Sequence, residues 1–380
     1  MNKDLKTVFI GINGYDYPYV RVRCYNFAKE VKKYGIDSRV LSFRDDFAPN
    51  LSGIEMLTLR DRRKLYLNLR ALLDILIKKD DLLYIQKVHY HSAAPYFLSR
   101  MTGRKFILDY DDWDLDRSPL FNRSFLNKFF FGADGTEAVT GKIARDACAC
   151  IASSSYLCDF LSQYNKKVFY IPTGVDTEKF KREKDNRSKD RINLIWTGNI
   201  WGNVIYDNVM FLLKCFSKIN PSGKRVSLTI VASGDYYEKV KNDSAYLDYP
   251  GEVNFLNWVS PDEMNKILEG TDIGLLPLVT DEENKTWMMS KSPTKLFEYM
   301  AMEIPSVATR FGEAPKIVKE GVTGFLAENE EEFVEKLNLL ISDDNLREKA
   351  GINARRDAED NYSLNVLGKR LAQILKEILK

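Results

Sequence analysis

The chain has 380 residues, more than one hydrophobic core usually serves, which predicts two or three domains. Hydrophobic residues make up 44% and charged residues 29%, a composition that excludes a disordered chain, and no apolar run reaches the roughly 20 residues that cross a bilayer. Five cysteines without a C-x-x-C pair and only two histidines argue against a disulfide framework and against zinc chemistry built on histidines. The first residues do not form a signal peptide, so we expect a cytoplasmic protein.

The net charge of +2 is divided unevenly along the chain. Residues 1–180 hold 28 Lys and Arg against 22 Asp and Glu, a balance of +6, whereas the remaining 200 residues hold 28 against 32, a balance of −4. The first half is therefore the part that we expect to approach an anionic surface.

Short apolar runs alternate with helical patterns through the first half. Residues 7–11 read as a strand, Gly11 to Gly14 as a glycine turn, and 22–34 as a helix, which together open a βαβ unit. Further strands are predicted at 38–43, 82–86, 105–108, 149–152 and 168–171. This alternation predicts a parallel sheet with helices on both faces, where ligands bind at the carboxyl ends of the strands.

The densest acidic cluster, Asp109 to Asp116, follows one of these strands. A D-x-D pattern suits magnesium or manganese held with a diphosphate. Alternatively, Asp111 or Asp112 orients a reacting hydroxyl or stabilises positive charge, or the aspartates simply cap a helix and form a turn. The sequence leaves these three interpretations open, and we expect no bound metal.

Two segments combine basic with apolar residues. Residues 57–79 place seven arginines and lysines among leucines, and residues 117–131 interleave basic residues with five phenylalanines. Such helices either pack on a sheet or lie on an anionic membrane. We expect packing for 57–79 and predict contact with an anionic membrane surface for 117–131. No nucleic-acid motif is present, so we expect no nucleic-acid partner.

The second half repeats the pattern of the first. Residues 181–191 are highly charged and lack a periodic apolar pattern, which predicts a domain boundary after residue 180. Strands follow at 193–196, 227–231, 253–255, 273–276 and 305–309, and residues 364–379 form an amphipathic helix. We therefore predict an α/β protein with two doubly wound parallel sheets, in domains 1–180 and 181–363.

Residues 291–326 concentrate the signals of a binding site. Ser292 and Pro293 read as a helix start, with the hydroxyl as cap and the proline at the first helical position. A helix N-terminus suits phosphate, and Lys295 adds a charge that the helix alone disfavours there. Glu298 lies on nearly the same face, where its carboxylate can accept both hydroxyls of a ribose. An ordinary i, i+3 Lys–Glu pair on an amphipathic helix is the alternative.

At this point the residues resemble a known family, the retaining glycosyltransferases of the GT-B fold in glycosyltransferase family 4. The resemblance rests on residues 293–301 (PTKLFEYMA), 304–309 (IPSVAT) and 321–326 (GVTGFL), supported by 171–176 (IPTGVD). It implies two facing Rossmann-like domains, the first binding the acceptor and the second the nucleotide-sugar. It also implies that helix 364–380 returns to the first domain.

The resemblance assigns roles to individual residues. Glu298 corresponds to the carboxylate that holds the ribose, and Lys295, with Asp111 or Asp112 on the acceptor side, is expected to be catalytic. The remaining donor contacts that it implies are Gly14, Gly198, Asn199, Trp258, Val259, Ser290, Lys291, Pro293, Thr294 and Arg310.

Three departures from the family pattern stand out, the first being that Asp111 or Asp112 stands where relatives often have a histidine after the strand at 105–108. Ser290 occupies the position eight residues before Glu298 where relatives commonly have a second glutamate. The loop after Gly198 lacks the arginine and lysine that usually neutralise the diphosphate, for which Lys295, then Lys291, then Arg310 are the candidate replacements.

The resemblance implies transfer of a sugar from a nucleoside-diphosphate-sugar to a hydroxyl of a glycan or lipid-linked acceptor, in polysaccharide or glycolipid synthesis. No cofactor is expected, since the nucleotide-sugar is a co-substrate. The expected location is the cytoplasm, peripheral at the inner face of the membrane. The alternatives are a non-catalytic nucleotide-sugar-binding partner protein and a nucleotide-sugar epimerase or hydrolase on the same fold.

Overall fold

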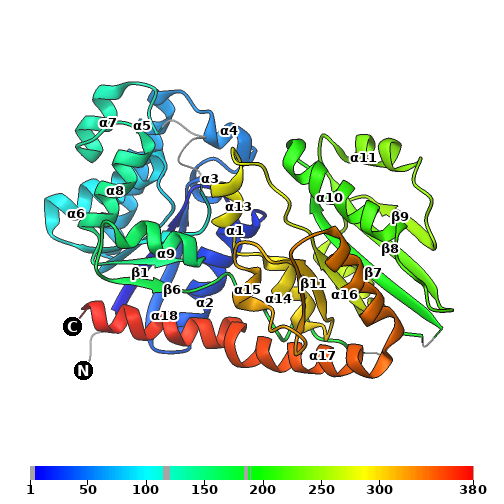
Figure 1. Cartoon of the computed structure of the whole chain (residues 1–380). Coiled ribbons are helices and arrows are strands. Elements are labelled where there is room, and N and C mark those ends of the chain that lie inside the picture. Colours follow the sequence, from blue (N-terminus) through cyan, green and yellow to red (C-terminus); the bar gives the residue numbers. More distant parts are fainter. Residues whose placement is uncertain (1–4, 114–119, 184–186, 189, 380) are drawn as a thin grey trace. The chain divides into compact units, whose positions relative to one another are not determined.

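The computed structural model describes residues 5–113, 120–183, 187–188 and 190–379, without the side chains of Leu5, Pro261 and Asp262. The chain divides into two compact units (Figure 1), each described here by itself. The first unit comprises Met1–Thr173, Ser290–Ser292 and Leu364–Lys380, and the second comprises Gly174–Met289 and Pro293–Ser363. Residues 174–180, expected in the first domain, group with the second unit, where the Val175 amide donates to the Tyr362 carbonyl at 2.9 Å.

The first unit contains a six-stranded sheet in the order β2-β1-β3-β4-β5-β6, with every pair parallel. Its strands are β1 (Leu5–Gly11), β2 (Ile36–Ser42), β3 (Leu82–Gln86), β4 (Lys105–Tyr110), β5 (Ala149–Ala152) and β6 (Val168–Tyr170). Because β1 lies between β2 and β3, the connections leaving β1 and β2 run in opposite directions across the sheet. Such a reversal opens a ligand-binding crevice at the carboxyl ends of the strands.

Helices cover both faces of this sheet because its strands alternate apolar side chains between two cores. Val8 and Ile10 enter the core beneath α5, α6 and α8, whereas Phe9 enters the core beneath α2 and α18. The terminal helix α18 lies along α2 (Figure 1). The helical segments of this unit are α1 (Pro18–Val20), η1 (Arg21–Asn26), α2 (Phe27–Lys32), α3 (Phe43–Phe47), α4 (Gly53–Leu57), α5 (Asp61–Lys78), η2 (Tyr90–Ser92), α6 (Ala93–Thr102), α7 (Ser124–Phe131), α8 (Thr136–Asp146), α9 (Ser155–Ser162) and α18 (Leu364–Leu379).

The second unit contains a six-stranded parallel sheet in the order β12-β11-β10-β7-β8-β9. Its strands are β7 (Arg191–Asn199), β8 (Arg225–Ser233), β9 (Glu252–Leu256), β10 (Ile273–Leu276), β11 (Ser306–Thr309) and β12 (Gly324–Ala327). The strand order reverses between β7 and β10, as in nucleotide-binding sheets of this type. The prediction of an α/β fold with two doubly wound parallel sheets is confirmed.

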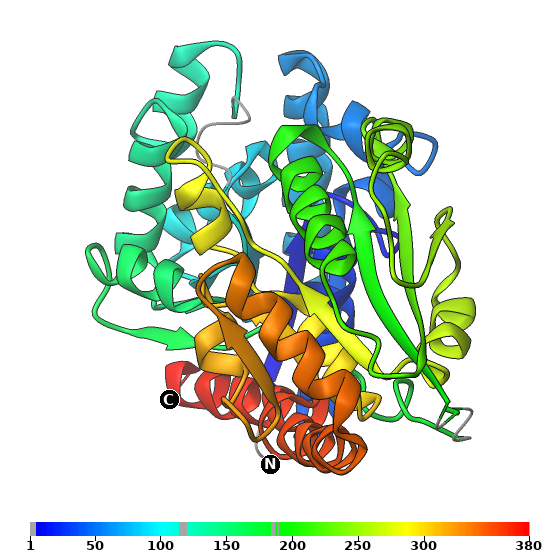
Figure 2. The ribbon, with the colours of Figure 1, turned by 45° about the vertical axis from the view of Figure 1, so that its right-hand side comes forward.

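Helices also cover both faces of the second sheet. α10, α11 and α16 pack over one face, as the turned view of Figure 2 lets the reader follow, and α12, α14 and α17 pack over the other. The sequence analysis missed β12, because its four residues directly after the turn at Gly321 carry too little pattern to read as a strand. The helical segments are α10 (Gly202–Ser217), α11 (Tyr237–Ser244), α12 (Pro261–Glu269), α13 (Lys285–Met289), α14 (Thr294–Ala301), α15 (Ala314–Ile317), α16 (Glu330–Ser342), α17 (Asp344–Asp357) and η3 (Ala358–Tyr362).

A buried ion pair joins three parts of the first unit. The Arg23 guanidinium donates to both carboxylate oxygens of Asp109, through Nε at 2.8 Å and through Nη2, and both side chains are fully buried. Its Nη1 donates to the Ile171 carbonyl at 2.7 Å. The pair therefore connects η1, the end of β4 and the segment that leaves the sheet after β6. Removal of one partner leaves the other charge buried without a counter-charge, which lowers the free energy of unfolding far more than loss of an exposed ion pair does.

We predict that Asp109→Asn lowers the free energy of unfolding of the first unit by about 3–5 kcal/mol, because a buried guanidinium loses its counter-charge. Hydrogen exchange of β1 and β4, followed by mass spectrometry, measures this loss, and the strands of the second unit serve as an internal reference. Lys142→Met is the matched control, since Lys142 pairs with Asp146 at 3.5 Å and both side chains are about one third exposed. Equal effects of the two variants would contradict the assigned role of burial.

Candidate functional site

The candidate donor site of the second unit lies at the end of β7, one of the two strands where the sheet order reverses. Gly198 precedes the last residue of β7, with φ of 155°. A Cβ placed on Gly198 would lie 3.2 Å from the Lys295 ammonium nitrogen and 3.1 Å from the Trp196 ring. The lysine therefore reaches directly over the Gly198 backbone. The structure thus brings together two of the residues predicted from the sequence.

Helix α14 presents Lys295 in its first turn. The helix begins at Thr294, and Pro293 is the N-cap, with no side-chain cap hydrogen bond. The predicted cap was wrong: the Ser292 hydroxyl accepts a hydrogen bond from the Thr173 amide at 3.1 Å instead. A helix N-terminus without a side-chain cap presents backbone N–H groups and partial positive charge, which suits an anion.

The apolar face of α14 fixes the direction of its polar residues. Leu296, Phe297, Tyr299 and Met300 are fully buried or nearly so, whereas Glu298 is half-buried. Gly274 in β10 makes this packing possible, since a Cβ there would lie 2.3 Å from the Tyr299 ring. Burial of the Tyr299 ring raises the pKa of its hydroxyl.

The other predicted donor residues lie in different settings. The Asn199 side-chain amide oxygen Oδ1 accepts a hydrogen bond from the Ser233 hydroxyl at 2.6 Å, which joins the ends of β7 and β8. Trp258 follows β9 and is 67% exposed, and Val259 packs against the core beside it. Arg310 pairs with Glu328 at 3.0 Å and with Glu320 at 3.5 Å. Its charge is thus already shared between two carboxylates.

Ser290 and Lys291 belong to the first unit in this structure, not to the second. Ser290 is fully buried, and its hydroxyl accepts a hydrogen bond from the Trp113 amide at 3.1 Å. The residue that replaces the expected glutamate therefore holds the loop that follows β4.

In the first unit, polar side chains meet at the ends of β3 and β4. The Asp111 carboxylate is buried, and one of its oxygens accepts a hydrogen bond from the Gln86 side-chain amide at 3.0 Å. The Lys87 ammonium nitrogen lies 3.7 Å from the same oxygen and 4.0 Å from an Asp112 oxygen. Burial raises the pKa of Asp111 to about 6, and the charge of Lys87 opposes this shift.

Lys87 comes directly after β3, at a strand end where the sequence analysis expected ligands to bind, although it assigned this residue no role. It has a left-handed backbone with φ of 63°, unusual for a residue other than glycine, and its amide donates to the Asp109 carbonyl at 2.7 Å. Its ammonium group lies 4.9 Å from the centre of the Tyr19 ring. The Tyr19 hydroxyl accepts a hydrogen bond from the side-chain amide of Asn13 at 2.6 Å. A non-glycine residue in this conformation directly after a central strand is a signal of a functional site that only the structure reveals.

Two amide oxygens beside this cluster are buried without a hydrogen-bond partner among the described residues. They belong to Asn13 and Gln86, which are 1% and 0% exposed. Buried polar atoms are normally paired, so these oxygens suit a donor hydroxyl that is supplied from outside the chain.

No three His, Cys, Asp or Glu side chains among the residues described gather so as to hold a metal ion. Asp114 and Asp116 of the predicted acidic cluster lie outside the described residues, as do Arg117 and the two residues after it. The absence of a bound metal therefore stays a prediction.

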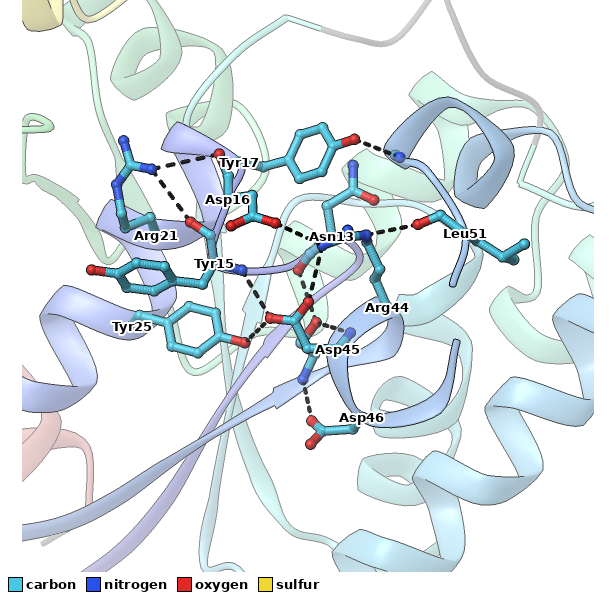
Figure 3. Close-up of polar contacts among 12 residues, drawn as sticks. Asn13, Tyr15, Asp16, Tyr17, Arg21, Tyr25, Arg44, Asp45, Asp46 and Leu51 are labelled. Carbon is cyan, nitrogen blue, oxygen red and sulfur yellow. Dashed lines mark hydrogen bonds and ion pairs between the residues drawn. The ribbon is translucent and has the colours of Figure 1, made fainter. Parts of the chain in front are cut away.

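The turn after β1 is filled by a carboxylate from α3 (Figure 3). The Tyr15 amide donates to an Asp45 oxygen at 2.9 Å, and the Tyr25 hydroxyl donates to the same oxygen at 2.6 Å. A Cβ on Gly14 would lie 1.8 Å from the other Asp45 oxygen. A side chain at position 14 would therefore require the Asp45 carboxylate to move. The predicted contact of Gly14 with donor phosphates stays a prediction.

Comparison with known proteins gives a partial match to a family model and a shared fold. Residues 191–343 match the family model described as Glycosyl transferases group 1. Solved structures with the same fold include Anabaena HepE in complex with UDP and glucose, with a TM-score of 0.68 and 15% identity over 98% of this chain and 100% of that chain. Sucrose-phosphate synthase from Thermosynechococcus elongatus has a TM-score of 0.70 and 11% identity over 99% of each chain. The chain therefore has the GT-B fold, as predicted.

Curated relatives match only part of the chain. A GDP-mannose-dependent alpha-(1-6)-phosphatidylinositol monomannoside mannosyltransferase of Mycolicibacterium smegmatis is 23% identical over 61% of this chain and 65% of its own length. The capsular polysaccharide biosynthesis glycosyltransferase CapM of Staphylococcus aureus is 24% identical over 56% of this chain and 55% of its own. The chain thus spans less than two thirds of the length of these curated relatives.

We predict that Gly14→Ala lowers stability by about 1–3 kcal/mol, because the new methyl group displaces the Asp45 carboxylate. The same substitution made in an Asp45→Ala background is expected to cost at least about 1 kcal/mol less, since the obstructing group is gone. Thermal unfolding of the four proteins of this double-mutant cycle measures the coupling. Additive effects would show that Asp45 is not what excludes a side chain at position 14.

Proposed function

We propose that this protein is a retaining glycosyltransferase of glycosyltransferase family 4, which transfers a hexose from a nucleoside-diphosphate-sugar to a hydroxyl of a glycan or lipid-linked acceptor. The observation that carries the proposal is the Lys295 ammonium group over the Gly198 backbone, at the start of a helix without a side-chain cap. Two sources of positive potential, the Lys295 ammonium group and the helix N-terminus, thus converge at the strand-order reversal of a sheet with the GT-B fold.

In this proposal, each group of donor-site residues binds a different part of the nucleotide-sugar. Lys295 and the N-terminus of α14, formed by Pro293 and Thr294, stabilise the charge that develops on the leaving diphosphate. Glu298, one helical turn further along the same helix face, accepts hydrogen bonds from the ribose hydroxyls. Trp258 and Val259 provide the surface for the base, which the 67% exposure of the tryptophan leaves open to a ligand.

The reaction that we propose needs no protein base. The bond between the anomeric carbon and the phosphate oxygen breaks, the acceptor oxygen bonds to that carbon on the same face, and the acceptor proton passes to the leaving diphosphate. Ionised Asp111, supported by Gln86 and Lys87, accepts a hydrogen bond from an acceptor hydroxyl next to the reacting one and favours positive charge on the sugar. No step requires a metal or a cofactor in this proposal.

The relatives support the acceptor class. Named relatives act on phosphatidylinositol monomannoside and in capsular polysaccharide biosynthesis. The proposed location, in the cytoplasm at the inner face of the membrane, follows from such an acceptor. Among the residues described, no helix is both long and apolar enough to cross a bilayer.

One observation favours a second candidate, a non-catalytic protein that binds a nucleotide-sugar. Ser290 replaces the glutamate that relatives commonly use, and its buried hydroxyl is engaged with the Trp113 amide. A panel of nucleotide-sugars tested by thermal shift and by product formation separates the candidates. Binding without product favours the second candidate, whereas turnover without any acceptor favours an epimerase or hydrolase.

We predict that Lys295→Met lowers kcat by about 10²–10³-fold, because one donor of positive charge to the leaving group is lost. Glu298→Gln is expected to weaken nucleotide-sugar binding by about 10–100-fold, the value of a charged hydrogen bond. Initial rates and calorimetric titration measure the two effects. Lys349→Met, on an exposed position of the same unit, is the control. Normal kinetics and binding in both site variants would refute the donor assignment.

We predict that the rate of transfer rises with pH through about 6 as Asp111 ionises. Lys87→Met removes the cation that opposes the upward shift in the pKa of Asp111, so the rising limb moves to higher pH. The other charges acting on Asp111, from Asp109, Arg23 and Asp112, are unchanged in this variant. Rate profiles from pH about 5 to 8 measure the shift. Lys29→Met, exposed in the same unit, is the control.

A stability measurement provides a readout of Asp111 that is independent of activity. Its pKa is raised in the folded chain, so the folded state binds the extra proton between the ordinary value and about 6. The contribution of this group to stability is therefore complete at low pH and is lost as the pH rises through about 6. Asp111→Asn removes that decline. A wild-type profile that Asp111→Asn and Lys87→Met leave unchanged would contradict the assignment.

A further inference from the structure

Helix α5 exposes apolar side chains along the face that points away from its own sheet. Of the eighteen large apolar side chains exposed in the part of the chain that the structure describes, five belong to this helix. They are Tyr66, Leu69, Leu73, Leu76 and Ile77, between 40% and 76% exposed. At 100° per residue they share an arc of about 100°, a single stripe along the helix. Sequence analysis expected this segment to pack on the sheet, which is true only of its opposite face.

That opposite face accounts for the packing. Leu67, Ala71 and Ile75 are fully buried or nearly so in the core over the first sheet. A helix that packs against the rest of its unit on one face normally turns polar residues to water on the other, so a second apolar stripe is not explained by the fold.

The charges beside the stripe are positive. Arg62, Arg63 and Arg70 are exposed on or beside it. The two carboxylates of the helix are already engaged: Asp61 accepts from the amides of Asn122 at 2.9 Å and Arg123 at 3.1 Å. Asp74 pairs with Arg39 at 2.7 Å and with Lys78 at 2.9 Å. The outward face therefore presents cations whose charge is not offset by carboxylates of the same helix.

Helix α7 extends this surface. The contacts of Asp61 with Asn122 and Arg123 bring the N-termini of α5 and α7 together. α7 exposes Phe125 and Phe129, 60% and 62%, one helical turn apart. Arg123 and Lys128 are exposed beside them. Two helices thus carry the same combination of apolar and basic side chains.

We propose that the outward face of α5, continued by α7, is a docking surface for an anionic lipid membrane. The apolar stripe would lie among the acyl chains near the headgroups while the arginines contact lipid phosphates. The charge decides between this occupant and a second copy of the chain. In a two-fold dimer the same arginines would face one another across the interface, and like charges oppose that contact.

The test is sedimentation of the full-length chain with vesicles of phosphatidylcholine alone and of phosphatidylcholine with phosphatidylglycerol. We expect binding to the anionic vesicles only, weakened by salt. Arg62→Ser/Arg63→Ser is expected to lower the partition coefficient about 25-fold, from the contribution of each cation near an anionic surface. Leu69→Ser/Leu73→Ser is expected to lower it at least about tenfold, since the apolar area that enters the membrane is lost.

The matched control is Tyr246→Ser/Ile352→Ser, which removes two exposed apolar side chains from the second unit. It should bind like the wild type. Thermal unfolding of every variant verifies that each is folded, which the exposure of the substituted residues favours. Equal binding of the α5 variants, binding to neutral vesicles alone, or a dimer that Leu69→Ser/Leu73→Ser dissociates would each overturn the proposal. Vesicle binding uses neither donor nor acceptor, so its failure leaves the proposed transferase activity untouched.

Discussion

Parallel pairing in both sheets is the constraint on which the candidate sites depend. Because all the strands of a sheet point the same way, their carboxyl ends meet at one edge, where the loops to the covering helices begin. Gly198, at the end of β7, and Lys87, directly after β3, lie at such edges. Backbone geometry thus gathers residues that are far apart in the sequence before any side-chain contact contributes.

The candidate sites of the two units differ in their charge. In the second unit, Lys295 stands over a glycine backbone at a helix N-terminus, an arrangement of positive potential. In the first unit, Lys87 lies beside the buried carboxylate of Asp111, whose pKa burial raises to about 6. Positive potential can stabilise the leaving phosphates of a donor. A buried carboxylate whose pKa depends on its neighbours can accept a hydrogen bond from a hydroxyl and stabilise a developing positive charge.

The sequence predicted much of this because the decisive signals are local. Short apolar runs identified eleven of the twelve strands, and the spacing of Lys295 and Glu298 placed both on one side of α14. It missed β12, whose four residues are too few for a pattern. It also placed the cap at Ser292, which instead bonds to Thr173, a residue more than a hundred positions away. Distant partners of this kind leave no trace in local spacing.

The same limit explains Lys87 and Asp45. A left-handed lysine and a carboxylate that fills a glycine turn are consequences of tertiary packing, and neither residue type signals such a role in sequence. Gly14 shows that one signal can have two causes. A glycine in a turn after the first strand suggests close approach of a ligand, and here the Asp45 carboxylate, fixed by Tyr15 and Tyr25, also occupies the space that a side chain would need.

Helix α5 shows the limit of periodicity itself. A periodic repeat of apolar residues shows that a helix has an apolar face. It does not show whether the helix has a second apolar face, or which surface each face packs against. In α5 the inner stripe is satisfied by the sheet, so the outer stripe requires a second apolar phase. The arginines lie on or beside that stripe, and the carboxylates of the helix are already engaged, so the charges favour an apolar phase with a negatively charged surface. A membrane surface meets both requirements at once, whereas a protein partner would need an apolar groove lined by acidic residues.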